Sequence, residues 1–508
     1  MEPYSDELLW LVICGFVVAF VLAFGIGAND VANSFGTSVG SKVLTLTQAC
    51  ILATIFEIAG AVLIGYKVSD TMRKGILDVT LYDDGGERLL AAGCLAALIA
   101  GAAWLIIATA LRLPVSGTHS VVGATVGFTL VAKGPIGIRW STLGAIVLSW
   151  FISPALSGTV SAVLYWFVRR FILRASQPLA AGLKALPFFY GATIAVNVVS
   201  VVLDGPKLLA MDNIPLWMAL SGSVAVGALG AIGVCAFLVP YYKRRFVPPP
   251  VNFTLGLSNG DSCDTIARGE LGRLSTMKMP IAVEFDTPPP RSDKGPEGSA
   301  WSIECEIRNT RLAAITPNSS AAPLLRSSSP APPVAPPPPP PDALRLFSFL
   351  QVLTATFGAF AHGGNDVSNA IGPLVALWLL YTEGGAHARA ETPLAILVFG
   401  GVGIALGLWL WGRRVIRTVG EDLTSITPDT GFTIELGAAL TVLIASKAGL
   451  PISTTHCKVG SVVCVGYFSE KSVDWSLFRN IIFAWVVTVP AVAATAALAM
   501  LALEAFVV

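Results

Sequence analysis

The stretch Gly27-Ala28-Asn29-Asp30-Val31-Ala32-Asn33 decides the fold of this 508-residue chain, because it occurs twice. The second copy reads Gly363-Gly364-Asn365-Asp366-Val367-Ser368-Asn369. Another pair follows in the same order: Leu113-Pro114-Val115-Ser116-Gly117-Thr118-His119, then Leu450-Pro451-Ile452-Ser453-Thr454-Thr455-His456. Asp30 and Pro114 are 84 positions apart, and Asp366 and Pro451 are 85 positions apart. Two motifs at nearly the same separation indicate an internal duplication.

The composition is that of a membrane protein. Hydrophobic residues make up 54% of the chain and charged residues 13%, whereas soluble proteins carry roughly 25% charged residues. Uncharged runs such as Leu89–Leu111 and Leu143–Val168 can each cross a hydrocarbon core, which takes about 20 residues. We therefore expect an all-α polytopic protein in a lipid bilayer, with six clear spans before residue 243.

Charge, cysteine and histidine content argue against other classes of protein. A net charge of +1 gives no basic surface for a nucleic-acid partner. The eight cysteines contain no CxxC pair, and four scattered histidines are too few for a metal cluster. Residues 1–7 hold three acids and no basic residue, which predicts no cleavable signal peptide. We expect no enzyme and no resident cofactor, because no set of nucleophile, base and orienting group is visible.

The composition divides the chain into two membrane halves and a linker. Residues 1–242 form the first half, residues 243–343 the linker, and residues 344–508 the second half. The linker is polar and ends in the run Pro336–Pro341, which predicts disorder with a polyproline tail. A protein partner docked on the proline run is the functional alternative. Lys243-Arg244-Arg245 directly follows a span, which favours a cytosolic linker.

This orientation sets a condition on the number of spans. If the halves are inverted-topology repeats, the second begins on the cytosolic face and the first begins outside. An odd number of crossings must then precede the linker, yet six are clear. The segment after Leu113 supplies the seventh crossing, or the inversion is wrong.

The duplicated Asn/Asp motifs are candidate cation sites. Polar, glycine-rich segments such as Gly25–Ser41 are costly within a membrane unless they line a cavity, so we expect them to face one. Carboxylate and amide oxygens are hard ligands suited to Na⁺, and an aspartate could instead carry a proton. A role in helix pairing alone is the structural alternative. The candidate sodium ligands are Asn29, Asp30, Asn33, Asn365, Asp366 and Asn369.

The hydroxyl-rich segments after Pro114 and Pro451 are candidate anion sites. Proline, glycine and hydroxyl residues in a row suit a broken helix or a re-entrant hairpin, where free N–H groups point into a cavity. Ser116, Thr118, Ser453 and Thr455 are the matched hydroxyls. The adjacent His119 and His456 serve either as hydrogen-bonding scaffold or as ligands.

Three further ionisable residues lie inside the apolar runs. Glu57 and Glu435 are candidates for a cation path or a proton path, with a buried ion pair as the alternative. They do not align with each other when the motifs are superposed. His362 has no counterpart in the first copy and is interpreted as a packing or gating variant.

These motifs resemble the inorganic phosphate transporter family, of the sodium- or proton-coupled type. The resemblance rests on residues 27–42, 113–120, 363–373 and 431–463, and covers both membrane halves. It implies an inverted-repeat symporter at the plasma membrane with about twelve spans, outward termini and a large cytosolic loop. Lys447 departs from the asparagine that is usual before the second Pro motif.

The resemblance also implies roles for particular residues. The phosphate site carries over to Asp30, Ser116, Thr118, Asp366, Ser453 and Thr455. The sodium ligands carry over to the motif asparagines and aspartates, and Glu57 and Glu435 match acidic positions important for transport. A proton-coupled phosphate symporter, a sulfate symporter, and a non-transporting surface receptor or scaffold remain as alternatives. A homodimer is a further assembly that we leave open.

Overall fold

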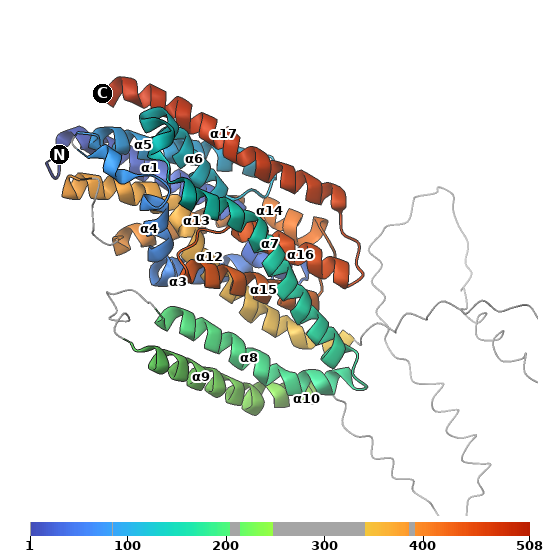
Figure 1. The fold of residues 1–508 in the computed structure, drawn as a ribbon. Coiled ribbons are helices and arrows are strands. Elements are labelled where there is room, and N and C mark those ends of the chain that lie inside the picture. The colour runs from blue at the N-terminus through green and yellow to red at the C-terminus, as the bar shows by residue number, and fades with distance from the viewer. Residues whose placement is uncertain (1, 84, 204–213, 247–340, 386–391, 508) are drawn as a thin grey trace, which may run out of the picture. The chain divides into compact units, whose positions relative to one another are not determined.

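The computed structural model describes residues 2–83, 85–203, 214–246, 341–385 and 392–507, all of which belong to one unit (Figure 1). These residues are helical, and among them β-structure is limited to two isolated bridges, Leu77 with Ile138 and Thr424 with Val473. Most of the expected linker, residues 247–340, lies outside the described residues, so its disorder stays a prediction. The expected linker ends differ, because helices extend through Phe246 and begin at Pro341.

The first half contains ten α-helices within the described residues. They are α1 (Asp6–Asn29), α2 (Ala32–Gly40), α3 (Leu46–Ile64), α4 (Tyr66–Lys74), α5 (Glu87–Ala110), α6 (Gly117–Lys133), α7 (Trp140–Val168), α8 (Pro178–Val202), α9 (Leu216–Gly233) and α10 (Val239–Phe246). The described second half contains α12 (Pro341–Glu383), α13 (Leu394–Trp411), α14 (Arg413–Arg417), α15 (Pro428–Lys447), α16 (Thr454–Phe468) and α17 (Trp475–Val507).

Eleven helical segments of the described chain are long and apolar enough to cross a membrane. Seven of them precede residue 247, and the seventh crossing that the sequence required is Gly117–Gly137. Its counterpart α16 has 15 residues and falls below the length of a clear span. Counting α16 brings the total to the expected figure of about twelve.

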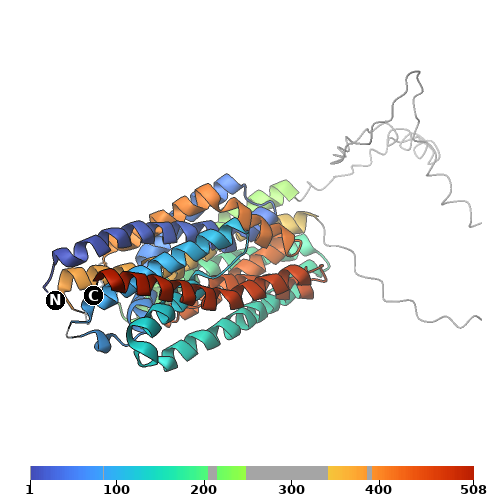
Figure 2. The ribbon, with the colours of Figure 1, turned by 90° about the horizontal axis from the view of Figure 1, so that it is seen from above.

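The ends of the described helices are arranged as odd numbers of crossings require. The N- and C-termini lie at one end of the bundle in both views (Figures 1 and 2). The end of α10 and the beginning of α12 lie at the opposite end. Seven spans before the linker, and five after it when α16 is counted, fit this arrangement.

The two halves are interleaved through equivalent helix pairs. α1 packs against α13 while α12 packs against α3, and α6 packs against α17 while α16 packs against α7. The first glycine of each Asn/Asp motif packs directly on the backbone of a helix from the other half. A Cβ on Gly27 would lie 1.8 Å from the carbonyl oxygen of Ile404, and one on Gly363 would lie 2.2 Å from that of Glu57. Glycine is therefore required at both positions.

Three helices have no counterpart in the second half. α8 and α9 pack against each other, and α8 also contacts α12. With α10 they run along one side of the bundle (Figure 1). The duplication therefore covers α1–α7 and α12–α17, and the helices before the linker are an addition to it.

The two Asn/Asp motifs differ in backbone continuity. The first copy has a slight interruption at Asp30 and Val31, whose backbones stay in the right-handed helical region. The second copy lies within the continuous helix α12. The glycines are held in helical conformation because neighbouring backbones pack directly on them.

Candidate functional site

The strongest breaks in the helices lie at two tips, defined as residues 112–118 and 449–455. α5 and α15 each end in a Schellman motif, in which one residue adopts a positive φ. That residue is Arg112 (φ 60°) in the first tip and Gly449 (φ 68°) in the second. The amides of Leu113 and Leu450 then donate back to carbonyls at the helix ends. The prolines that follow cannot continue a helix, so the chain turns back as a helical hairpin.

A serine begins the returning helix of each hairpin. Ser116 and Ser453 have extended backbones, and their hydroxyl oxygens accept hydrogen bonds from the amides of His119 (3.3 Å) and His456 (3.2 Å). Both serines are buried, and accepting these bonds leaves their own hydroxyl hydrogens to donate. Each tip therefore holds a serine donor at a helix N-terminus.

The two copies meet through reciprocal hydrogen bonds. The Asn33 amide donates to the Thr455 hydroxyl at 2.8 Å, and the Asn369 amide donates to the Thr118 hydroxyl at 3.1 Å. Each threonine in turn lies 3.1 Å from a main-chain carbonyl of the opposite tip, to which it can donate. The Asn/Asp motif of each copy is thus joined to the tip of the other copy.

The first asparagine of each motif braces the tip of its own copy. Asn29 donates to the Leu113 carbonyl at 2.9 Å and accepts from the Val115 amide at 3.1 Å. Asn365 donates to the Ile452 carbonyl at 3.0 Å and accepts from a serine hydroxyl of α15 at 3.3 Å. The side-chain oxygens of both asparagines are therefore already engaged.

The second asparagine of each motif has an unused oxygen. The side-chain oxygens of Asn33 and Asn369 are buried and have no hydrogen-bond partner among the described residues. Buried polar atoms are seldom left unpaired, so such atoms call for an explanation. Both oxygens belong to equivalent residues at the centre of the bundle, which makes them the best-placed vacant oxygen ligands of the candidate site.

The two motif aspartates have different surroundings. Asp30 accepts one hydrogen bond from the Gly117 amide at 3.1 Å, and the Thr455 hydroxyl lies 3.5 Å away. The Asp366 carboxylate is more fully engaged, with donors at Thr454 (2.6 Å), Asn369 (2.6 Å) and Asn365 (3.3 Å). Asp30 therefore has the greater remaining capacity to bind a ligand.

His362 joins the buried carboxylate Glu57 to the second motif. Its Nδ1 lies 2.7 Å from Glu57, and its Nε2 lies 3.0 Å from Asp366, although the latter contact falls outside hydrogen-bond geometry. All three side chains are buried. The first copy has Ile26 at the equivalent position, so this bridge exists on one side of the centre only.

Glu435 lies in a separate polar cluster. Its carboxylate accepts hydrogen bonds from four side chains, at 2.6 to 3.2 Å: Thr37 and Ser38 of α2, and Gln351 and Thr354 of α12. These donors satisfy the buried charge and join α2, α12 and α15. Glu57 and Glu435 thus serve different parts of the centre.

The two tip histidines pack together behind the tips. The rings of His119 and His456 are 4.4 Å apart, and each stacks against a tryptophan, Trp150 at 3.8 Å and Trp485 at 3.7 Å. His456 Nδ1 lies 3.0 Å from the Trp150 carbonyl, and the Trp485 ring N–H donates to Pro114. Neither ring nitrogen of His119 has a hydrogen-bond partner among the described residues, so this histidine contacts its neighbours through ring packing.

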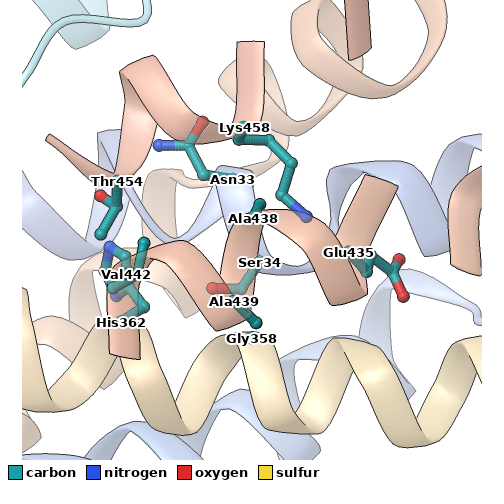
Figure 3. A pocket seen from close by; sticks show the side chains of 10 residues that line it. All are labelled: Asn33, Ser34, Gly358, His362, Glu435, Ala438, Ala439, Val442, Thr454 and Lys458. Atoms are coloured by element: carbon teal, nitrogen blue, oxygen red, sulfur yellow. The ribbon is translucent and has the colours of Figure 1, made fainter. Parts of the chain in front are cut away.

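Sequence reasoning missed three polar residues of the centre. Gln351 and Thr354 bind Glu435 but precede the Asn/Asp motif of α12 and belong to no motif themselves. Lys458 is buried among the residues that line a small pocket (Figure 3). A lysine within an apolar run is itself a signal, since charged residues inside spans usually have a function.

A helical bundle of many spans around a buried, duplicated polar centre defines a polytopic membrane transport protein. The chain belongs to the phosphate transporter family, whose model matches residues 26–496. This match includes both pairs of motifs and both halves of the bundle.

Known relatives extend over nearly the whole chain. Sodium-dependent phosphate transporter 1-A of Danio rerio is 42% identical, over 96% of this chain and 93% of the relative. Sodium-dependent phosphate transporter 2 of Homo sapiens is also 42% identical, over 96% of each chain. A solved structure described as the sodium-dependent phosphate transporter is 32% identical with a TM-score of 0.72, over 98% of this chain and 99% of that one.

Proposed function

We propose that this protein imports inorganic phosphate together with Na⁺ across the plasma membrane. The observation that carries the proposal is the reciprocal contact between the Asn/Asp motif of each copy and the hydroxyl tip of the other. Cation ligands and anion donors are thereby placed beside each other in the centre of the bundle. Membership of the phosphate transporter family and the names of the relatives support phosphate and sodium as the cargo.

The proposed phosphate-binding site lies between the two tips. Ser116, Ser453, Thr118 and Thr455 donate hydrogen bonds to phosphate, and the helix N-termini add positive potential. A threonine hydroxyl has a single hydrogen, and in this structure it is within reach of a carbonyl of the opposite tip. Phosphate binding therefore requires the two tips to separate and exchange these bonds for bonds to the anion.

The aspartates of the phosphate-binding site need a cation beside them. Asp30 and Asp366 would repel phosphate unless they hold Na⁺ or accept a hydrogen bond from a protonated phosphate oxygen. The unpaired oxygens of Asn33 and Asn369 supply neutral ligands next to these carboxylates. Asn29 and Asn365 complete the proposed sodium set, chiefly by positioning the tips. Na⁺ is cargo here rather than a resident cofactor.

Proton coupling is the second candidate, and one observation favours it. His362 lies between Glu57 and Asp366, so a titratable chain reaches the centre from one side. Sulfate is the weaker candidate substrate, because at neutral pH it has no proton to offer an aspartate.

We further propose a topology of inverted repeats with outward termini and a cytosolic linker. The termini and the linker ends lie at opposite ends of the bundle, and basic residues follow the last span before the linker (Figure 2). Residues 1–242 and 344–508 are the two membrane halves in this scheme. A homodimer, and a protein partner or scaffold role for the proline-rich linker, stay predictions.

Uptake of radiolabelled phosphate into proteoliposomes tests the function. An inward Na⁺ gradient should drive accumulation, and excess sulfate should compete little. Equal uptake in sodium and choline media at fixed pH would refute sodium coupling. A rise in that uptake when a proton gradient is imposed would then support the proton-coupled alternative.

A further inference from the structure

Lys458 places a positively charged side chain in the centre of the bundle, and the proposed phosphate and sodium sites do not include it. It lies in α16, about one helical turn from Thr455, and its exposed fraction is 4%. No other lysine or arginine side chain that the structure describes is buried. Its amine forms no hydrogen bond or close ion pair with a described residue. A buried charge without a direct partner is costly, so its retention calls for a function.

The amine faces a small pocket beside the proposed cargo sites. Figure 3 shows the Lys458 side chain extending from α16 toward α15, the helix that carries Glu435. Asn33 and Thr454 line the same pocket, and both also contact the proposed cargo sites. The cavity has a volume of about 20 Å³, which is room for a water molecule but not for phosphate. Lys458 is therefore close to the cargo sites without being a phosphate ligand in this state.

The role that we infer for Lys458 follows from the number of buried acidic groups around it. The centre holds four buried carboxyl groups, those of Asp30, Glu57, Asp366 and Glu435. Glu435 already has four hydrogen-bond donors, so Lys458 is not needed to satisfy its oxygens. The Glu435 carboxylate acts on the Lys458 amine electrostatically without forming a close ion pair, so the charge of the amine also acts on ions bound nearby.

We propose that Lys458 is a tethered cation that takes the place of one Na⁺ in the charge balance of the transport centre. This inference rests on the proposed function. The fixed amine favours the phosphate anion and disfavours Na⁺ through the low-dielectric interior. Removing its charge should therefore shift the two affinities in opposite directions, whereas a purely structural defect would weaken both.

Coulomb's law sets the expected size of these shifts. For unit charges on the order of 10 Å apart at an effective dielectric constant of about 20, the interaction changes a binding constant roughly ten-fold. Lys458→Met keeps an unbranched apolar side chain of similar length and removes the charge. Lys458→Arg keeps the charge and is the matched control.

The test measures phosphate and sodium activation of uptake in proteoliposomes that contain each variant. For Lys458→Met we expect apparent phosphate affinity to fall roughly ten-fold while apparent sodium affinity rises, with steeper sodium dependence as an additional Na⁺ binds. Lys458→Arg should keep both constants near those of the wild type. Unchanged constants in Lys458→Met, or a parallel loss of both affinities, would overturn the inference.

A second variant decides the matter if Lys458→Met does not fold. Lys458→Gln also removes the charge, and its amide keeps a polar group beside the pocket. The same opposite shifts in phosphate and sodium affinity are expected, and unchanged constants or a parallel loss of both would overturn the inference. Loss of sodium-dependent uptake by the wild-type protein would be a different result, since it would refute the proposed function itself.

Discussion

The tip hydroxyls show how individual residues serve two states. Thr118 and Thr455 hold the tips together through carbonyls of the opposite copy, while Ser116 and Ser453 keep their hydrogens available. In the proposed cycle the serines can bind phosphate first, and the threonines exchange partners afterwards. In this proposal the serines bind phosphate first, whereas the threonines join the two tips until phosphate replaces their partners.

Alanine changes at these hydroxyls should weaken phosphate binding. A hydrogen bond to a charged group is worth about 1.5–3 kcal/mol, so Ser116→Ala, Ser453→Ala, Thr118→Ala or Thr455→Ala should each lower apparent phosphate affinity roughly ten-fold to a hundred-fold. Sodium dependence should change less. Thr125→Ala is the matched control, because this buried hydroxyl of α6 bonds only to its own helix. Weakened sodium activation with normal phosphate affinity would contradict the anion-site assignment.

Replacing Glu435 with glutamine should lower the stability of the protein. In Glu435→Gln an amide group replaces an acceptor that four donors face, so at least one buried donor loses its partner. We expect the free energy of unfolding to fall by about 1–3 kcal/mol, seen as a lower melting temperature of the purified protein in detergent. Thr354→Ser keeps its donor and should melt close to the wild type. Equal melting of Glu435→Gln and wild type would show that the cluster adds no stability.

The sequence predicted the motif residues of the centre but not all of their partners. Asn33 and Thr455 could be found because each belongs to a duplicated motif. Their pairing across copies depends on tertiary packing that no motif encodes. His362 was noticed as unmatched, yet its bridge to Glu57 required the three-dimensional contact of α12 with α3. Lys458 was overlooked although its charge stood out within an apolar run.

At the scale of the elements, close helix contacts define the centre. Gly27 and Gly363 let α1 and α12 approach α13 and α3 until backbone touches backbone. The structure uses these glycines for packing. The breaks in the helices lie at the proline tips, where the sequence predicted a broken helix or a re-entrant hairpin.

Glycine-to-alanine changes test this packing. Gly27→Ala and Gly363→Ala place a methyl group within 1.8 and 2.2 Å of a carbonyl oxygen, which forces the helices apart. We expect a loss of folded protein on size-exclusion chromatography. Gly144→Ala in α7 is the control, because nothing lies within 4 Å of its added methyl group; alanine there should be neutral or stabilising by up to about 1 kcal/mol. Normal yield of Gly27→Ala would contradict the packing role.

For the whole molecule, the sequence predicted the duplication. It did not predict how the helices without a counterpart in the second half pack against the bundle. Repeated motifs predicted two related halves and an odd number of crossings before the linker. α8 and α9 could be recognised as apolar runs, but the position of α8 beside α12 could not be predicted, since periodicity does not specify neighbours. The α6 span is not among the six spans that are clear in the sequence, because its hydroxyl and glycine residues lower its hydrophobicity.

Deletion of the linker tests whether the two halves suffice. Residues 251–335 lie outside the described residues, and we predict that removing them leaves phosphate uptake intact. The described ends, Phe246 and Pro341, lie at the same end of the bundle and can be joined by a flexible chain (Figure 1). Loss of uptake with normal surface expression would assign the linker an active role. Cleavage by protease added outside intact cells would reverse the proposed topology.

In the proposed mechanism, both copies act together as one sodium-coupled phosphate site. The most direct test is Na⁺-driven phosphate uptake into proteoliposomes by Asp30→Asn and Asp366→Asn, which keep the side-chain shape and remove the charge. We predict that either change nearly abolishes uptake while the protein remains folded, because each copy supplies a carboxylate to the shared centre. Normal sodium-driven uptake by either variant would contradict the two-copy site.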